Sequence, residues 1–73
     1  MTLSNVKANQ RYIITAVKDG DLRRRLLDMG FTPGCKIIAL SKAPFGGTVL
    51  VCIRGINVAL RKNAADSITV EGV

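Results

Sequence analysis

The feature that most constrains this chain is a single short amphipathic segment, between Asp19 and Gly34, in a sequence that otherwise favours β-structure. At 100° per residue, Leu22, Leu26 and Met29 fall in one narrow stripe, as in a helix with one buried side. We therefore predict a helix at about residues 20–29 whose stripe packs on the core. One short helix in a small β-rich chain must cover one side of a sheet.

Both ends of this predicted helix carry recognisable signals. Asp19 or Asp21 has the residue type that caps a helix N-terminus, where a carboxylate accepts an orphan backbone N–H and complements the helix dipole. At the other end, Gly30 suits a left-handed stop, and Phe31 can fold back on Leu26.

The remaining segments alternate apolar and polar residues or are rich in β-branched residues, as strands are. Turn residues separate them, and residues 63–67 form a short connector with room for one helical turn. In the cleanest alternation, Ile56, Val58 and Leu60 are expected to face inward. The predicted strands are Gln10–Val17, Lys36–Ala43, Thr48–Arg54, Ile56–Arg61 and Ser67–Val70. This pattern predicts a small all-β fold over residues 1–73: one five-stranded, partly open β-barrel with one inserted short α-helix.

The side-chain inventory argues against an enzyme and against a resident cofactor. The chain has no histidine, which is the commonest general base, and Gly46-Gly47 lacks the pattern of a phosphate-binding loop. Two cysteines, Cys35 and Cys52, are too few for a structural zinc site within one chain. We expect two half-buried thiols and no metal, with a metal shared between two chains as an open alternative.

The charge leaves more than one class of partner open. A net charge of +6 and a pI of about 10.0 favour anionic partners, nucleic acid among them. Tyr12, Phe31 and Phe45 are the only aromatic residues, and single-strand binders stack bases on several. We therefore expect a protein-binding module rather than a nucleic-acid binder. No apolar run is long enough to span a membrane and no signal peptide precedes the fold, which indicates a cytoplasmic protein.

A contact surface is predicted from helix geometry and one loop. Three consecutive arginines, Arg23 to Arg25, point about 100° apart and so fan around the polar side of the helix. Leu27 lies away from the apolar stripe, between two of these arginines, where it is expected to meet solvent or a partner. The loop after the second strand carries an aromatic at its tip. The predicted contact residues are Arg23, Arg24, Leu27, Pro44, Phe45, Gly46 and Gly47.

Three segments together resemble one known family. They are Leu22–Gly34, Ala43–Gly47 followed by Val49 and Val51, and Arg54-Gly55 with Val58–Arg61. Their order is similar to that of the ferrous iron transport protein A (FeoA) family. The resemblance implies an SH3-like barrel without enzymatic activity and without a small-molecule substrate. It also implies a cytoplasmic accessory protein that binds FeoB, the membrane iron permease with a GTP-binding domain.

Two alternatives stay open beside that resemblance. The first is a basic SH3-like barrel that binds nucleic acid. The second is a relative of the C-terminal barrel of iron-dependent repressors of the diphtheria-toxin-repressor type, although no DNA-binding helices precede this barrel. The chain departs from the family at Asn9, where glycine is usual, but asparagine tolerates the same turn.

Overall fold

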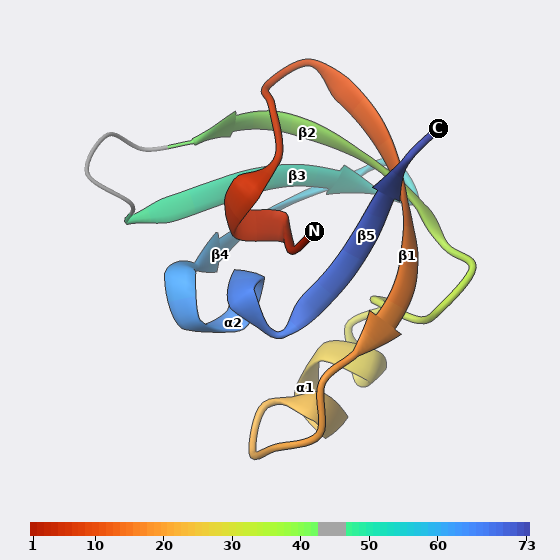
Figure 1. Cartoon of the computed structure of the whole chain (residues 1–73), viewed down its shortest axis with the longest axis vertical. Helices are drawn as coiled ribbons and strands as arrows, with labels where there is room; N and C mark the ends of the chain where they lie inside the picture. Colours follow the sequence, from red (N-terminus) through yellow and green to blue (C-terminus); the bar gives the residue numbers. More distant parts are fainter. Residues whose placement is uncertain (43–46) are drawn as a thin grey trace.

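A computed structural model describes residues 1–42 and 47–73 of the chain. Within them, one antiparallel sheet curves around a core, with strand order β4-β3-β2-β1-β5 and α1 between the first two strands of the chain (Figure 1). The elements are η1 (Leu3–Asn5), β1 (Gln10–Val17), α1 (Arg23–Asp28), β2 (Lys36–Lys42), β3 (Thr48–Ile53), β4 (Ile56–Arg61), α2 (Lys62–Asp66) and β5 (Ile68–Gly72). The prediction of a small all-β fold with an inserted helix is confirmed.

The core lies on the concave side of the sheet, where alternate strand residues meet Leu26 of α1. Phe31, Val51, Ile68 and Val70 are fully buried, and every side chain in this core is apolar. Two of the three aromatic residues, Tyr12 and Phe31, are buried in this core. The buried strand residues are Tyr12, Ile14, Val17, Ile37, Ala39, Val49, Val51, Ile53, Leu60, Ile68 and Val70.

Two predicted turns use the left-handed backbone region, which Asn9 and Gly55 accept readily. Arg54 and Gly55 have φ of 53° and 79°, and Ile53 pairs with Ile56 across them. Two successive positive φ angles make a two-residue hairpin of type I′, whose twist matches that of the strands it joins. Asn9 likewise has φ of 64°, so the turn before β1 is confirmed.

The C-terminal end of α1 follows the prediction closely. The Phe31 N–H donates to the Leu26 carbonyl and the Gly30 N–H to the Leu27 carbonyl, both at 3.0 Å. Gly30 has φ of 104°, so these bonds form a Schellman motif, which satisfies carbonyls that the helix leaves free. This turn places the Phe31 side chain in the same core cluster as Leu26.

The N-terminal end of α1 differs from the prediction. The helix spans Arg23–Asp28 rather than residues 20–29, and Leu22 occupies the cap position with no side-chain cap bond. Gly20 has φ of 152°, so the preceding residues form a bend instead of a first helical turn. The prediction that Asp19 or Asp21 caps the helix is therefore wrong. The Asp19 carboxylate pairs with Arg23 instead, at 3.4 Å from Nε.

Two apolar residues that we expected in the core are exposed. Met29 is 50% exposed and Ile56 is 64% exposed. Met29 is the C-cap residue of the short α1, and it lies at the surface on the same side of the helix as Leu22 and Leu26. Ile56 has the inward parity of β4, but β4 is an edge strand, and none of the described strands lies beyond it. Leu27 shows the opposite difference. We expected it to meet solvent or a partner, but its side chain is half-buried and packs on the core.

The other differences concern the bounds of elements. The second helix α2 spans residues 62–66 and so begins one residue before the predicted connector at 63–67, for which one helical turn was allowed. The closing strand begins one residue later than predicted and extends to Gly72, while β2 is described to Lys42 and Ala43 lies outside the described residues. Such shifts of one or two residues at ends are common when local pattern alone is used.

The two edges of the sheet are treated differently. The outer side of β5 is covered by the start of the chain: the Val70 N–H donates to the Met1 carbonyl at 2.8 Å, and Thr2 bridges to Thr69. Leu3 then enters the core with no exposed surface. At the opposite edge, β4 pairs with β3 alone among the described strands.

Candidate partner-binding surface

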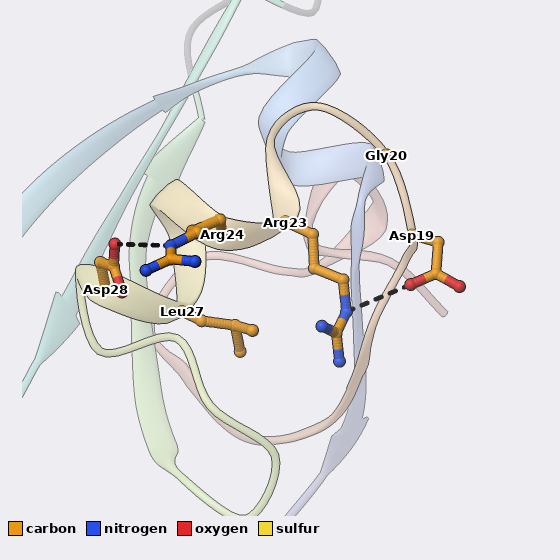
Figure 2. Close-up of a pocket in the computed structure, with 6 residues that line it drawn as sticks. All are labelled: Asp19, Gly20, Arg23, Arg24, Leu27 and Asp28. Carbon is orange, nitrogen blue, oxygen red and sulfur yellow. Dashed lines mark ion pairs between the residues drawn. The ribbon is translucent and has the colours of Figure 1, made fainter.

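The predicted helix residues Arg23, Arg24 and Leu27 lie together around one shallow hollow on the surface. Its volume is about 460 Å³, and it lies on the outer side of α1 beside the bend that follows β1 (Figure 2). Asp19, Gly20 and Asp28 complete its wall. The hollow therefore combines two cations, two anions and one apolar side chain.

Arg23 ties the helix to the end of β1. Its Nε lies 3.4 Å from Asp19 Oδ1 and also donates to the Val17 carbonyl at 3.4 Å. The Arg23 side chain is 45% exposed, whereas the Asp19 side chain is fully exposed. Arg23 thus both positions α1 and contributes charge to the hollow, so a substitution here affects structure as well as contact.

Arg24 is the freer of the two arginines. Its Nε lies 3.9 Å from Asp28 Oδ2, and the two side chains are 90% and 72% exposed. A pair so exposed stabilises a protein by about 0–1 kcal/mol, because water screens both charges. Such a pair can open at little cost when a partner offers another carboxylate. Arg24 is consequently the residue best suited to report on contact without disturbing the fold.

Leu27 supplies the apolar part of the hollow. Figure 2 shows its side chain between the Arg23 and Arg24 side chains, pointing across the hollow. Part of this side chain packs on the core, and the rest lines the hollow. A half-buried leucine with a fixed position is a better anchor for a partner than a freely exposed one, because less conformational entropy remains to be lost on binding.

The loop half of the predicted surface has a different status. Pro44, Phe45 and Gly46 lie outside the described residues. Gly47 is exposed, and its carbonyl accepts the Lys62 N–H at 3.1 Å, next to the first residue of α2. Gly47 is not among the residues that line the hollow. The structure therefore brings together the helix residues of the predicted surface and places Gly47 beside α2.

Sequence reasoning missed Asp19, Gly20 and Asp28 as parts of this surface. The signal was available, because Asp19 with Arg23 and Arg24 with Asp28 have the i,i+4 spacing at which helix-surface ion pairs form. From the sequence, Asp19 was interpreted only as a possible helix cap, and Asp28 was given no role. The local charge of the hollow is balanced as a result, although the chain as a whole is basic.

Within residues 1–42 and 47–73, no three His, Cys, Asp or Glu side chains gather as metal ligands do. Cys35 and Cys52 are free and half-buried, as we expected of each. None of the helices in the described ranges has the length and apolarity that crossing a membrane requires.

Comparison with known proteins decides the family. The model of the FeoA domain matches residues 1–72. The chain belongs to the FeoA family. A curated relative from Porphyromonas gingivalis, an Fe(2+) transport protein A/Fe(2+) transporter FeoB fusion protein, is 36% identical over 72 residues. That match covers 97% of this chain but only 8% of the relative, so the similarity is to one small part of a much longer protein.

Solved structures of family members have the same architecture. The FeoA protein of Chlorobium tepidum is 38% identical, with a TM-score of 0.87 over 100% of this chain and 70% of that one. FeoA of Stenotrophomonas maltophilia, described as an SH3 domain protein and solved in complex with zinc, is 29% identical, with a TM-score of 0.85 over 97% of this chain and 89% of that one. The SH3-like fold expected from the family resemblance is therefore confirmed.

The same fold also occurs inside a metal-dependent repressor. A manganese-dependent transcriptional repressor has a TM-score of 0.90 over 100% of this chain and 41% of that one, at 21% identity. Identity this low shows a shared fold alone. The likeness to repressor barrels that we left open is thus real at the level of architecture.

Proposed function

We propose that this chain is an accessory module of a ferrous iron uptake system that binds the cytosolic part of a FeoB-type permease and supports or regulates it. The observation that carries the proposal is the fused relative, in which a segment like this chain and a FeoB transporter form one polypeptide. Fusion holds two proteins at high local concentration, which favours pairs that work in contact. The module itself would perform no chemical step.

The hollow beside α1 is the contact surface that we propose for this module. It offers Leu27 as an apolar anchor and the exposed Arg24 beside it as a charge that can be redirected. An acidic side chain on the permease would replace Asp28 as the ion-pair partner of Arg24, since the existing pair is long and well hydrated. Phe45 and its neighbours in the loop are proposed as a second contact, independent of the hollow.

Charge reversal at Arg24 tests the hollow most cleanly. Affinity for the purified cytosolic part of the FeoB permease of the same organism is measured by calorimetry for the original chain and for Arg24→Glu. Arg11→Glu, a charge reversal at another exposed arginine on β1, is the matched control. We expect Arg24→Glu to weaken binding about three- to tenfold, mostly through a lower association rate, and Arg11→Glu to change it less than about twofold.

Two further variants separate the parts of the proposal. Leu27→Ala should weaken binding by about tenfold or more if the leucine is a buried anchor, and a circular dichroism melt checks that the variant folds. Phe45→Ala tests the loop in the same assay. Unchanged affinity in Arg24→Glu and Leu27→Ala would remove the hollow from the interface. Absence of binding by the unaltered chain would refute the adaptor role itself.

A further inference from the structure

The outer edge of β4 carries backbone groups without partners. Ile53 and Ile56 flank the two-residue type I′ turn, so they form a hydrogen-bonded pair, and such pairs then alternate along the hairpin. Val51 with Val58 and Val49 with Leu60 are the next bonded pairs. The N–H and C=O groups of Asn57 and Ala59 therefore point away from β3. Within the described ranges no residue donates to or accepts from them.

The inward-facing side chains of this edge are only partly covered by the core. Ile56, Val58 and Leu60 alternate with polar or small residues, as in a strand with one covered face. Only Leu60 is buried, while Val58 is half-buried and Ile56 is 64% exposed. Met29, the other exposed apolar residue of this region, lines a groove together with Leu60. Apolar surface is thus left open along an unpaired strand edge.

That groove runs between α1 and β4 and has a volume of about 390 Å³. Leu22, Leu26 and Met29 form its helix side, and Ala59 and Leu60 form its strand side. At the end of α1, a Cβ built on Gly30 would lie 3.9 Å from the guanidinium end of the Arg54 side chain, which extends toward the helix from the turn before β4. On β4 the groove is lined by residues 59–61, and Asn63 and Ala64 of α2 close the end beyond them.

The charge on this groove has one sign. Arg25 and Arg61 both line it, and no acidic side chain does so. Neither arginine forms an ion pair with a described carboxylate, unlike Arg23 and Arg24 around the hollow. An occupant that brings carboxylates would meet unpaired guanidinium groups, which bind carboxylates in fork geometry.

We propose that β4 accepts an extended acidic segment of a partner protein as a sixth strand. The segment's backbone would bond to the free groups of Asn57 and Ala59, as in β-strand addition. Its alternate apolar side chains would cover Ile56 and Met29, and its carboxylates would meet Arg25 and Arg61. This inference goes beyond the adaptor role proposed above, because it concerns a different surface and does not require the permease as the partner.

A second copy of the chain fits this edge less well than an acidic segment. Each copy has a net charge of +6, and pairing β4 with β4 would bring the arginines of two grooves into one interface. Like charges in apposition oppose association. Basic residues at a sheet edge are also a common defence against such pairing. Acidic chemistry in the occupant removes this repulsion.

The test uses two octapeptides of opposite charge and the unaltered chain. One acetylated peptide alternates valine with glutamate, and its control alternates valine with lysine. Titration is followed by amide NMR. We expect the glutamate peptide to shift the amide signals of Asn57, Ala59 and Met29 and to slow the exchange of the first two. The lysine peptide should bind at least about tenfold more weakly.

Two variants test the backbone and charge components separately. Ala59→Pro removes an N–H that faces away from β3, and edge strands tolerate proline at such positions, so the hairpin should persist while peptide affinity falls at least about tenfold. Arg61→Glu should lower the affinity about three- to tenfold, and Arg11→Glu, its matched control on β1, less than about twofold.

Three results would overturn the proposal. The first is equal affinity for the two peptides. The second is signal changes that map away from β4 and α1. The third is concentration-dependent protection of the Asn57 and Ala59 amides in the chain alone, which would identify a second copy as the occupant. If Ala59→Pro does not fold, unchanged affinity in Arg61→Glu is sufficient to reject the charge argument.

Discussion

The two edges of the sheet differ in whether their outward-facing backbone N–H and C=O groups are paired within the chain. At β5, the first residues of the chain bond to the strand, and Leu3 fills the core beneath it. At β4, the backbone groups of Asn57 and Ala59 stay unpaired within the described chain, and Ile56 stays exposed. An uncovered strand edge is open to pairing with another chain. The comparison indicates which side of this small barrel is closed and which side is available.

The hollow beside α1 differs from both edges. Its charged side chains form i,i+4 pairs within the chain, so its charge is balanced and its contacts with a partner require exchange of ion pairs. The groove beside β4 carries two arginines without such pairs. The two surfaces lie on different sides of the same short helix and so can be altered independently.

Amide hydrogen exchange should show the largest difference between the edges. The Val70 amide is bonded to Met1 and buried, so it should exchange only when much of the fold opens. The Asn57 and Ala59 amides should exchange with little protection. We expect rates that differ by roughly a thousandfold or more, measured by NMR after transfer to deuterated water. Equally fast exchange at Val70 would show that the N-terminal cover frays and that both edges are open.

Truncation of side chains at the two edges should have unequal effects on stability. Leu3→Ala removes a side chain with no exposed surface and leaves a cavity, so the free energy of unfolding should fall by about 2–5 kcal/mol. Ile56→Ala removes a side chain that is 64% exposed and should lower it by less than about 1 kcal/mol. Urea unfolding measures both. Similar losses of unfolding free energy in the two variants would show that the two edges do not differ in how well their side chains are covered.

Protonation of Asp66 at low pH should lower the free energy of unfolding, because this carboxylate helps to hold the N-terminal segment that covers β5. We expect this to be the smallest of the three effects. The hydrogen bond from the Ser4 hydroxyl, followed by that from Lys62, lowers the pKa of the Asp66 carboxyl below its usual value of about 3.9. A carboxyl with a lowered folded-state pKa stabilises the fold above its unfolded pKa and loses this contribution as pH falls through the folded value. The bond from Ser4 also holds the N-terminal cover against α2.

Comparison of unfolding at pH 7 and at pH 3 checks this prediction. Asp66→Asn should be less stable than the original chain at pH 7 and should lose less stability on acidification. Asp21→Asn is the control, since the Asp21 carboxylate makes no ion pair or hydrogen bond with a described residue. Identical pH dependence of stability in the original chain and in Asp66→Asn would show that Asp66 does not contribute to the loss of stability in acid.

Local chemistry made several elements predictable. Gly55 and Asn9 predicted turns because glycine and asparagine accept a positive φ that most residues avoid, and Gly30 with Phe31 predicted the end of α1 for the same reason. The alternation of β4 predicted its bounds correctly. These features depend on a residue and its neighbours within one turn of chain, so no knowledge of the fold is needed to interpret them.

Other features depended on what lies across space. Met29 and Ile56 have sequence patterns typical of buried positions, but the helix is short and β4 is an edge, so neither is covered. Likewise, the aspartates near α1 could serve as caps or as ion-pair partners, and only the bend at Gly20 decides between these roles. The candidate contact residues on α1 were predicted, whereas the groove beside β4 was not.

The sequence alone determined the order of the elements, the turns that join them and the membership in a family of ferrous iron transport proteins. Periodicity and turn chemistry are local, and they are written directly in neighbouring residues. The tertiary structure decided which strand edge is covered, which apolar side chains stay in solvent and which charges are already paired. These properties arise from contacts between segments that are distant in the chain, such as residues 1–3 against β5. The local pattern of residues does not show which distant segments come together.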